Sequence, residues 1–222
     1  MNESIPLSQK LYILGINTKK GGIISGPATA MNSLLSGSLI IELFRNGNIK
    51  FDNKKIIVVS SKTDNELHRF VLNKMNESKR QLKISRWINK LNYSAKFIKK
   101  AVQQNLVAKR VIRMQPKQFL FFKWKIPILL DKQLVAKLIA GIEKQIFSGS
   151  ATEDEMILLS FIEPGGFLRR IYTERASRKK ARKKLKKMMI ENPVSEAVAE
   201  AIMAAQAVAA SVAVSAATSG AS

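Results

Sequence analysis

Two groups of side chains in this sequence are suited to binding a partner, and both combine positive charge with apolar groups. The first group is a set of lysines, Lys96, Lys99 and Lys100, whose spacing of three and four residues places them close together on a helix. The second group is the apolar run 119–122, which has further cations beside it. Ammonium groups bind phosphate oxygens, and neighbouring apolar side chains suit a partner that is partly apolar. A phospholipid bilayer is one such partner.

The aromatic side chains of the second group, Phe119, Phe121, Phe122 and Trp124, have three interpretations. They could insert into the interface of a bilayer, or they could stack on nucleic-acid bases. They could also pack against a helical core, which is the most common use of aromatic residues on a half-buried hairpin. The pattern alone leaves these alternatives open.

A third basic segment covers residues 169–187, and it dominates the charge of the chain. The sequence has 38 Lys and Arg against 16 Asp and Glu, giving a formal net charge of +22. The bland interpretation of this segment is a solvated helix face. The functional interpretations are phosphate contacts with nucleic acid and attraction to an acidic membrane. The run by itself does not choose between them.

Catalytic residues in a recognisable arrangement are not found in the sequence. It has no cysteine and a single histidine, His68, so thiolate and imidazole clusters are excluded. Gly21-Gly22 has no adjacent phosphate-binding lysine motif, and the acidic run 153–155 is explained by helix capping. His68 is expected at a surface or boundary position. We therefore predict a non-enzymatic protein without cofactor or metal.

The distribution of apolar residues indicates a protein that acts outside the bilayer core. The first residues, 1–7, are polar and do not resemble a secretory signal peptide. The uncharged stretch 201–217 is mostly Ala, Ser and Val, which favours a core helix or a loosely packed tail over a membrane span. The absence of cysteine fits a reducing compartment. A cytoplasmic protein is expected.

Hydrophobic periodicity predicts a mostly α fold with two short hairpins in one domain, residues 1–217, followed by a disordered tail, 218–222. The expected helices cover 7–16, 27–45, 64–78, 79–92, 94–109, 131–147, 152–163, 167–190 and a segment from 195. Their expected N-caps are Ser8, Asp64, Asp131, Thr152 and Ser195. The first hairpin pairs 48–51 with 55–60 around Asp52-Asn53. The second pairs 111–114 with 118–124 around a break at Gln115-Pro116-Lys117.

Several short segments occur in an order that matches a known family. They are Leu7-Ser8 with 11–15, Gly22, Ile40-Ile41-Glu42-Leu43, Arg45-x-Gly47, Trp87-Ile88-x-x-Leu91, Asn105-Leu106-Val107-x-Lys109, 119–122, Pro127, the helix at Asp131 and Leu158-Leu159. Through these segments the chain resembles the Golgi phosphoprotein 3 family from about residue 7 to about residue 215. No single motif is specific, so the resemblance depends on their order and spacing.

The resemblance implies a helical bundle surrounded by amphipathic helices, with a hydrophobic hairpin projecting from one face. It also implies a peripheral membrane protein that binds phosphatidylinositol 4-phosphate on the cytosolic face of a membrane, the Golgi in a eukaryotic cell. The family builds its headgroup pocket from a Trp, an Arg, and two further Arg three residues apart. Lys96 and Lys99 occupy the positions of the last pair, whereas Pro27 and Ser36 occupy the other two. Lysine offers point-charge rather than bidentate contacts to phosphate.

The leading hypothesis is therefore a peripheral membrane protein that binds anionic phospholipid. Lys96 and Lys99, with Lys100 beside them, would contact lipid phosphate, and Phe119, Leu120, Phe121 and Phe122 would insert shallowly or mediate self-association. Residues 169–187 would add diffuse attraction to the same membrane. The alternative is a nucleic-acid-binding protein that uses the basic helix 169–187. An adaptor module without a working lipid site is the third possibility.

Overall fold

A computed structural model describes residues 5–191, 194–196 and 198–207 of the chain. Its elements are α1 (Leu7–Leu14), α2 (Ser25–Arg45), β1 (Ile49–Asp52), β2 (Lys55–Val58), α3 (Glu66–Asn76), α4 (Ile84–Asn92), α5 (Ala95–Ala108), β3 (Ile112–Phe119), β4 (Phe122–Leu129), α6 (Lys132–Ser148), α7 (Glu153–Ser160), α8 (Leu168–Ile171) and α9 (Arg175–Glu191). Residues 198–207 form a further helical segment. The predicted mostly α fold is confirmed, while the predicted stretch 208–217 and tail 218–222 lie outside the described residues.

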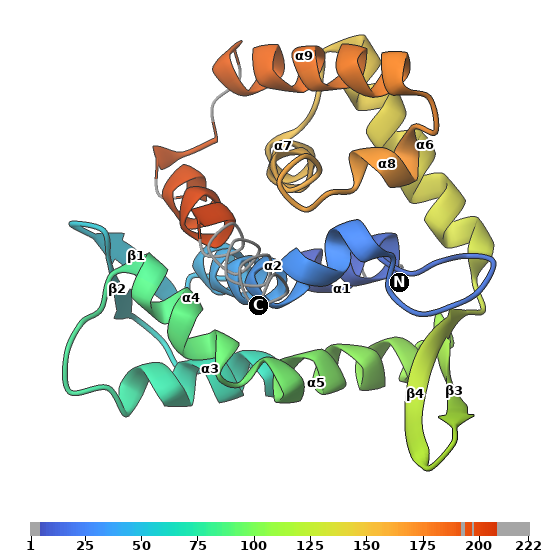
Figure 1. The fold of residues 1–222 in the computed structure, drawn as a ribbon. Coiled ribbons are helices and arrows are strands. Elements are labelled where there is room, and N and C mark those ends of the chain that lie inside the picture. Colours follow the sequence, from blue (N-terminus) through green and yellow to red (C-terminus); the bar gives the residue numbers. More distant parts are fainter. Residues whose placement is uncertain (1–4, 192–193, 197, 208–222) are drawn as a thin grey trace, which may run out of the picture.

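The helix α2 forms the centre of the structure because its middle is apolar on every side. Leu39, Ile40 and Ile41 are at most 2% exposed, as the sequence predicted for a helix deep in the core. Figure 1 shows α1 and α2 in the middle, with α3, α4 and α5 below them and α7, α8 and α9 above. Helix α6 runs along one side and connects the two groups. The architecture is therefore a central helix covered by amphipathic ones.

Of the five predicted N-caps, Asp131 and Thr152 are confirmed, and Ser195 lies directly before the helical residue 196, where its carbonyl accepts from the Ala199 amide. The Asp131 carboxylate accepts a hydrogen bond from the Leu134 amide at 2.8 Å. Thr152 and Glu155 form the expected capping box at the start of α7, and the hydrogen bond from the Thr152 amide lowers the pKa of Glu155. These caps satisfy amide groups that would otherwise have no partner at the helix start.

The other two predicted caps are wrong, because neighbouring residues take the role. Asn65, not Asp64, caps α3 through hydrogen bonds from the Leu67 and His68 amides. Helix α1 begins one residue before Ser8 and has no side-chain cap, because the Ser8 amide donates to Glu42 of α2 instead. A long-range contact thus replaces the local one.

Two predicted helices are shorter than expected. The segment before α4 runs beside β2, where the Ile56 amide donates to the Leu82 carbonyl at 3.0 Å, so the helix begins at Ile84 and not at residue 79. The predicted helix 167–190 is divided into α8 and α9. At the break, the side chain of Arg178 in α9 donates a hydrogen bond to the Tyr172 carbonyl, at the end of α8, at 3.1 Å. In both places, backbone groups find partners outside the predicted helix.

The hairpin β3–β4 is longer than predicted and turns at a different place. Its register pairs Phe119 with Phe122, so the two-residue turn is Leu120-Phe121, and Pro116 lies inside β3 opposite Lys125. The prediction of a break at Gln115-Pro116-Lys117 is wrong. Both strands of a two-stranded sheet are edges, and an edge strand accepts proline where the missing N–H would face solvent.

The base of this hairpin is attached to the loop between α1 and α2. The Gly22 amide donates to the Pro127 carbonyl at 2.8 Å. The backbone of Gly21 lies so close that a Cβ there would be 2.1 Å from Ile128 and 2.9 Å from the Pro127 carbonyl oxygen, and its φ is +71°. Glycine is therefore required at this contact, both for the conformation and for the approach.

Candidate membrane-facing site

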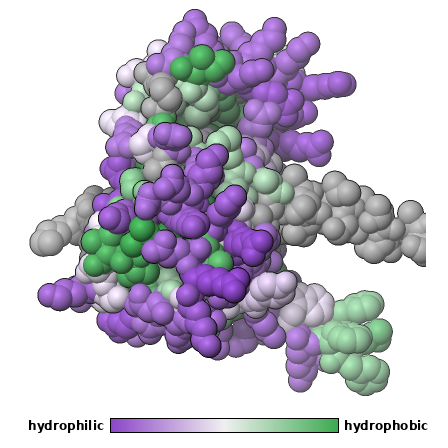
Figure 2. Space-filling model, turned by 90° about the vertical axis from the view of Figure 1, so that its left-hand side faces the viewer, coloured by the Kyte–Doolittle hydropathy of each residue, from purple (hydrophilic) through white to green (hydrophobic). Residues whose placement is uncertain are grey.

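The tip of the hairpin β3–β4 presents four consecutive apolar residues to solvent. Phe121 is 96% exposed, and Phe119, Leu120 and Phe122 are 67–74% exposed. Figure 2 shows the tip as a hydrophobic projection at the lower right, well separated from the rest of the surface. Packing against the core, the common use of such aromatics, is therefore excluded for these residues. A contiguous exposed apolar group of this kind indicates an interaction site.

The backbone of the turn is also unfavourable. Leu120 has φ +52°, a conformation that glycine or asparagine adopts far more readily than leucine. Neither the local conformation nor the burial of side chains accounts for leucine at this position. Positive φ is usual in the turn of a two-residue hairpin, but an apolar residue there is unusual, and strained residues cluster at functional sites.

Lysines surround the apolar tip at the level of the strands. Lys117 is paired with Trp124 across the hairpin, Lys123 with Gln118, and Lys125 with Pro116. All three lysines are exposed, and Trp124 is 46% exposed. The apolar tip is thus followed along the hairpin by three successive pairs that carry one lysine each, with Trp124 in the middle pair. An apolar end next to amphipathic and cationic side chains suits the boundary between acyl chains and phosphate groups.

The lysines that the sequence singled out lie at the beginning of α5, at the end of this helix that is far from the hairpin. Lys96 and Lys100 are exposed, while Lys99 is half-buried. The first turn of α5 has no acidic residue and no side-chain cap, so its free amide groups and the positive end of the helix dipole add to the lysine charges. An anion bound at this position would reduce the repulsion between the lysine charges and the positive end of the helix dipole.

An open groove of about 480 Å³ lies beside these lysines, between α3 and α5. It is lined by Lys74, Lys96 and Lys100 together with aromatic residues, and Lys99 is not among its lining residues. The family resemblance predicted Lys96 and Lys99 as the phosphate-binding pair, with Lys100 as a neighbour. Lys96 and Lys100 border this groove together, because residues four apart share a helix face.

The two altered pocket positions contribute no charge to this groove. Pro27 is buried in the first turns of α2. Ser36 is fully buried, and its hydroxyl donates to Asn92 Oδ1 at 2.9 Å, while Asn92 donates in turn to Ser33. Neither Pro27 nor Ser36 lines the groove. Ser36 belongs to a buried polar contact between α2 and α4.

The basic helix α9 forms a second cationic surface. Its buried side consists of Ala181, Leu185 and Met188. Several of its cations are already engaged: Arg182 pairs with Glu163, Lys187 pairs with Glu191, and Lys184 donates to the Phe147 carbonyl. Lys180 lies over the Phe147 ring, and the exposed cations without an ion pair, a hydrogen bond or a ring contact to another described residue are Arg175, Lys179, Lys183 and Lys186.

The surface of α9 is far from the hairpin tip. Figure 1 places α9 at the top of the molecule and the hairpin at the bottom, and Figure 2 shows the same vertical separation after a quarter turn. A membrane that lies along the lower face of the molecule would therefore not reach α9. The two cationic surfaces are separate features of the fold.

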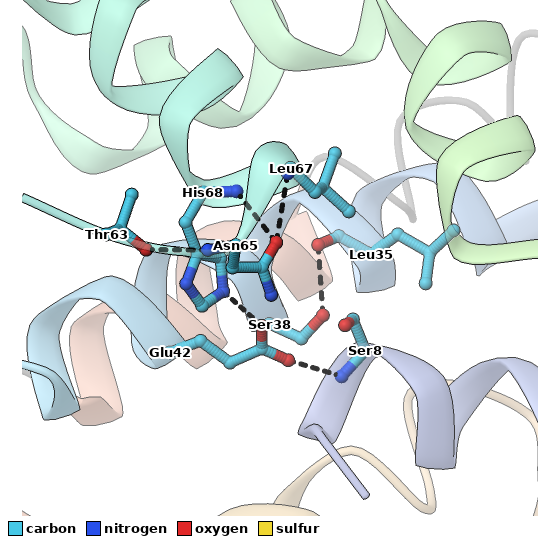
Figure 3. Close-up of polar contacts among 8 residues, drawn as sticks. All are labelled: Ser8, Leu35, Ser38, Glu42, Thr63, Asn65, Leu67 and His68. Atoms are coloured by element: carbon cyan, nitrogen blue, oxygen red, sulfur yellow. Dashed lines mark hydrogen bonds and ion pairs between the residues drawn. The ribbon is translucent and has the colours of Figure 1, made fainter. Parts of the chain in front are cut away.

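The histidine is part of a buried polar contact that the sequence did not predict. His68 is 5% exposed, so its expected surface or boundary position is wrong. Its Nε2 lies 2.7 Å from Glu42 Oε2, and the other oxygen of Glu42 accepts from the Ser8 amide at 2.7 Å. Figure 3 shows these residues converging from α1, α2 and α3. The carboxylate thus connects three helices.

A signal for this contact was present in the sequence. Glu42 is a single acidic residue inside the apolar run 39–43, and a charge in a core helix requires a partner. The contact lines an open groove of about 850 Å³, where Arg45 also pairs with Glu153 and Asp154. Within the described parts of the chain, no group of three His, Asp or Glu residues could hold a metal ion.

The fold and the exposed tip define a class of protein, a helical bundle with a projecting apolar hairpin. In the part of the chain that the structure describes, no helix has the length and apolar character needed to cross a membrane. Residues 7–205 match the family model of Golgi phosphoprotein 3 (GPP34), and the chain belongs to this family. The family consists of non-enzymatic adaptors that bind phosphatidylinositol 4-phosphate at Golgi membranes. None of the curated proteins matches this chain.

Proposed function

We propose that this protein is a peripheral membrane protein that binds anionic phospholipid, with phosphatidylinositol 4-phosphate as the headgroup that the family suggests. The observation that carries the proposal is the apolar tip, residues 119–122, whose members are 67–96% exposed. Phenylalanines this exposed are unfavourable in water and favourable in a bilayer interface. The tip inserts shallowly, and the protein acts on the cytosolic face of the membrane.

The cationic start of α5 supplies the second contact in this proposal. Lys96 and Lys99, with Lys100 beside them, bind lipid phosphate at the uncapped first turn of the helix. Each cation near an acidic surface contributes about 1 kcal/mol, and one weak contact binds a membrane poorly. The tip and the lysines therefore act together. Self-association through the tip in the absence of membrane is the competing use of the same residues.

Flotation with liposomes tests this function. Neutral vesicles are compared with vesicles that contain phosphatidylserine or phosphatidylinositol 4-phosphate. The variant Lys96→Glu/Lys99→Glu is expected to bind acidic vesicles at least ~10-fold more weakly, because two attractions become repulsions. Its matched control is Lys183→Glu/Lys186→Glu on α9, which has the same charge change at the other end of the molecule.

The result is decisive in both directions. The proposal is sustained when acidic vesicles are preferred and only the α5 variant loses binding. Equal binding to neutral and acidic vesicles, or no loss in the α5 variant, would contradict it. A preference for phosphatidylinositol 4-phosphate over phosphatidylserine at equal charge identifies the headgroup.

The exposed cations of α9 support nucleic-acid binding as a second candidate function. Arg175, Lys179, Lys183 and Lys186 follow one another at spacings of four, four and three, which places them on one helix face. Nucleic acid that accompanies the purified protein and leaves with salt would indicate this function. Charge reversal of Lys179, Lys183 and Lys186 is a better test than deletion, because α9 buries core residues.

A further inference from the structure

The outward face of α5 carries a continuous exposed stripe that ends near the hairpin. On the helix its residues are Phe97, Lys100, Gln104 and Val107, at spacings of three and four, and the exposed Tyr93 lies two residues before the helix and borders the same groove as Phe97. The buried side of the helix consists of Ala95, Ile98, Val102 and Leu106. Residues at these spacings lie on one helix face. The stripe is thus a surface of the molecule that no described element covers.

Aromatic side chains are concentrated at the far end of this stripe. Tyr93 is 92% exposed and Phe97 is 50% exposed. The ring of Phe97 lies 4.3 Å from that of Phe70 on α3, and the ammonium group of Lys74 lies 5.0 Å from the centre of the Phe70 ring. A tyrosine this exposed contributes little to the stability of the domain. The cluster is therefore suited to a contact outside the folded chain.

The charge around the cluster favours an anionic partner. Lys74, Lys96 and Lys100 line the groove that the aromatic rings border, and no Asp or Glu lines it. Tyrosine and phenylalanine beside lysine are typical of the interface of a bilayer, where rings occupy the headgroup level and ammonium groups contact phosphate. Rings and cations together thus match an acidic lipid surface.

The position of the cluster relative to the hairpin indicates the same partner. Helix α5 ends at Ala108, four residues before β3, so cluster and hairpin lie at its two ends. Twelve residues, from Phe97 to Lys109, span about 18 Å of helix. Figure 1 shows α3, α5 and the hairpin along the lower side of the molecule, and Figure 2 shows the tip at the lower edge after a quarter turn.

We propose that Tyr93 and Phe97 form a second membrane anchor, which enters the interface of an anionic bilayer together with the hairpin tip. This inference rests on the proposed function and extends it. Lys74 and Lys100 contact lipid phosphate beside the anchor. The two anchors lie beyond opposite ends of α5, so together they fix the orientation of the protein on the membrane, and each raises the effective concentration of the other.

Tryptophan placed at the anchor measures its insertion directly. The variant Tyr93→Trp/Trp124→Phe retains only the buried Trp87, which is 2% exposed, besides the new reporter. Vesicles of phosphatidylcholine with phosphatidylserine and brominated acyl chains quench a tryptophan that enters the bilayer. The matched control is Ile190→Trp/Trp124→Phe, because Ile190 is 71% exposed at the end of α9, away from the lower face.

The expected result is strong quenching at position 93 and none at position 190. A second variant, Tyr93→Ser/Phe97→Ser, is expected to reduce binding to acidic vesicles about tenfold while leaving the hairpin in place. Circular dichroism and thermal unfolding verify that this variant is folded.

Three outcomes would overturn the inference. Equal weak quenching at positions 93 and 190, with Trp124 of the unmodified chain quenched, would remove the second anchor but keep the proposed function. Absence of quenching at Trp124 and of flotation would remove both. A dimer without lipid that Tyr93→Ser/Phe97→Ser dissociates would show that a second copy of the chain, and not a membrane, covers the cluster.

Discussion

The two hairpins of this protein share a topology and differ in what they do with their apolar residues. In β1–β2, Ile49 and Ile56 are at most 4% exposed, and Phe51 packs on Phe44 with ring centres 4.8 Å apart. Its turn consists of Asn53 and Lys54, both with positive φ and both polar. Asparagine tolerates this conformation well. This hairpin follows the ordinary rules of a folded hairpin, with an apolar interior and a polar turn.

The hairpin β3–β4 reverses this arrangement beyond its base. Its buried residues, such as Ile112 and Leu129, are confined to the end that joins the bundle. Its turn is Leu120-Phe121, which is apolar and exposed. The comparison shows that turn chemistry distinguishes a hairpin that stabilises a fold from a hairpin that binds. The following predictions test this distinction.

The largest effect is expected when the turn of β3–β4 is given polar residues like those in the turn of β1–β2. The variant Phe119→Ser/Leu120→Asn/Phe121→Gly/Phe122→Ser creates an Asn-Gly turn, which suits a two-residue hairpin. We expect binding to acidic vesicles to fall at least ~100-fold, because the inserting apolar area is removed. Flotation and thermal unfolding measure the two properties separately, and the folded state is expected to remain intact.

The matched control for this variant is Lys54→Gly, which creates the same Asn-Gly turn in the hairpin β1–β2. Its binding to vesicles is expected to be unchanged. A tip variant that floats as well as the unmodified chain would show that the exposed tip has no role at the membrane.

A core substitution in the hairpin β1–β2 is expected to have the opposite effect, a loss of stability and not of membrane binding. Ile56→Ala should lower the free energy of unfolding by about 3 kcal/mol, because Ile56 is 4% exposed and its loss leaves a cavity. Phe121→Ala should change this free energy by less than about 0.5 kcal/mol, since the side chain is exposed. Urea denaturation measures both, and comparable losses would abolish the distinction between the hairpins.

The smallest effect is expected when only the backbone strain in the turn of β3–β4 is relieved. Leu120→Gly removes a side chain from a positive φ, so we expect the free energy of unfolding to rise by about 0.5 kcal/mol. Membrane binding should fall only slightly, because the three phenylalanines of the tip remain. Destabilisation by this substitution would show that Leu120 has a structural role.

Helix periodicity was sufficient to predict most of the fold, because the core of this protein is built from amphipathic helices around one apolar helix. It failed where tertiary contacts compete with local preferences. Pro116 resembles a turn residue in the sequence but is tolerated in an edge strand. Ser8 resembles a cap, but its amide binds the Glu42 carboxylate, 34 residues away in sequence. Neither partner is visible in a local window.

The site was predictable in composition and not in geometry. The apolar run 119–122 and the lysines 96–100 were found from residue types alone. Which lysines share a groove depends on how α5 is rotated against α3, and that rotation is set by packing. His68 was misplaced because its partner, Glu42, comes from a different helix. The charge and apolar character of a residue are known from the sequence, whereas the residues that it contacts depend on the fold.

The contact between the Gly21-Gly22 loop and β4 has a mechanical consequence. The hydrogen bond from Gly22 to Pro127 and the close approach of Gly21 to Ile128 hold the hairpin at its base, while its outer half is free of the bundle. The hairpin is thus held at its base and projects freely beyond it. A force on the tip would act on the loop that joins α1 to the central helix α2. The angle of the hairpin is therefore set at two glycines that lie 98 to 100 residues away from its turn in sequence.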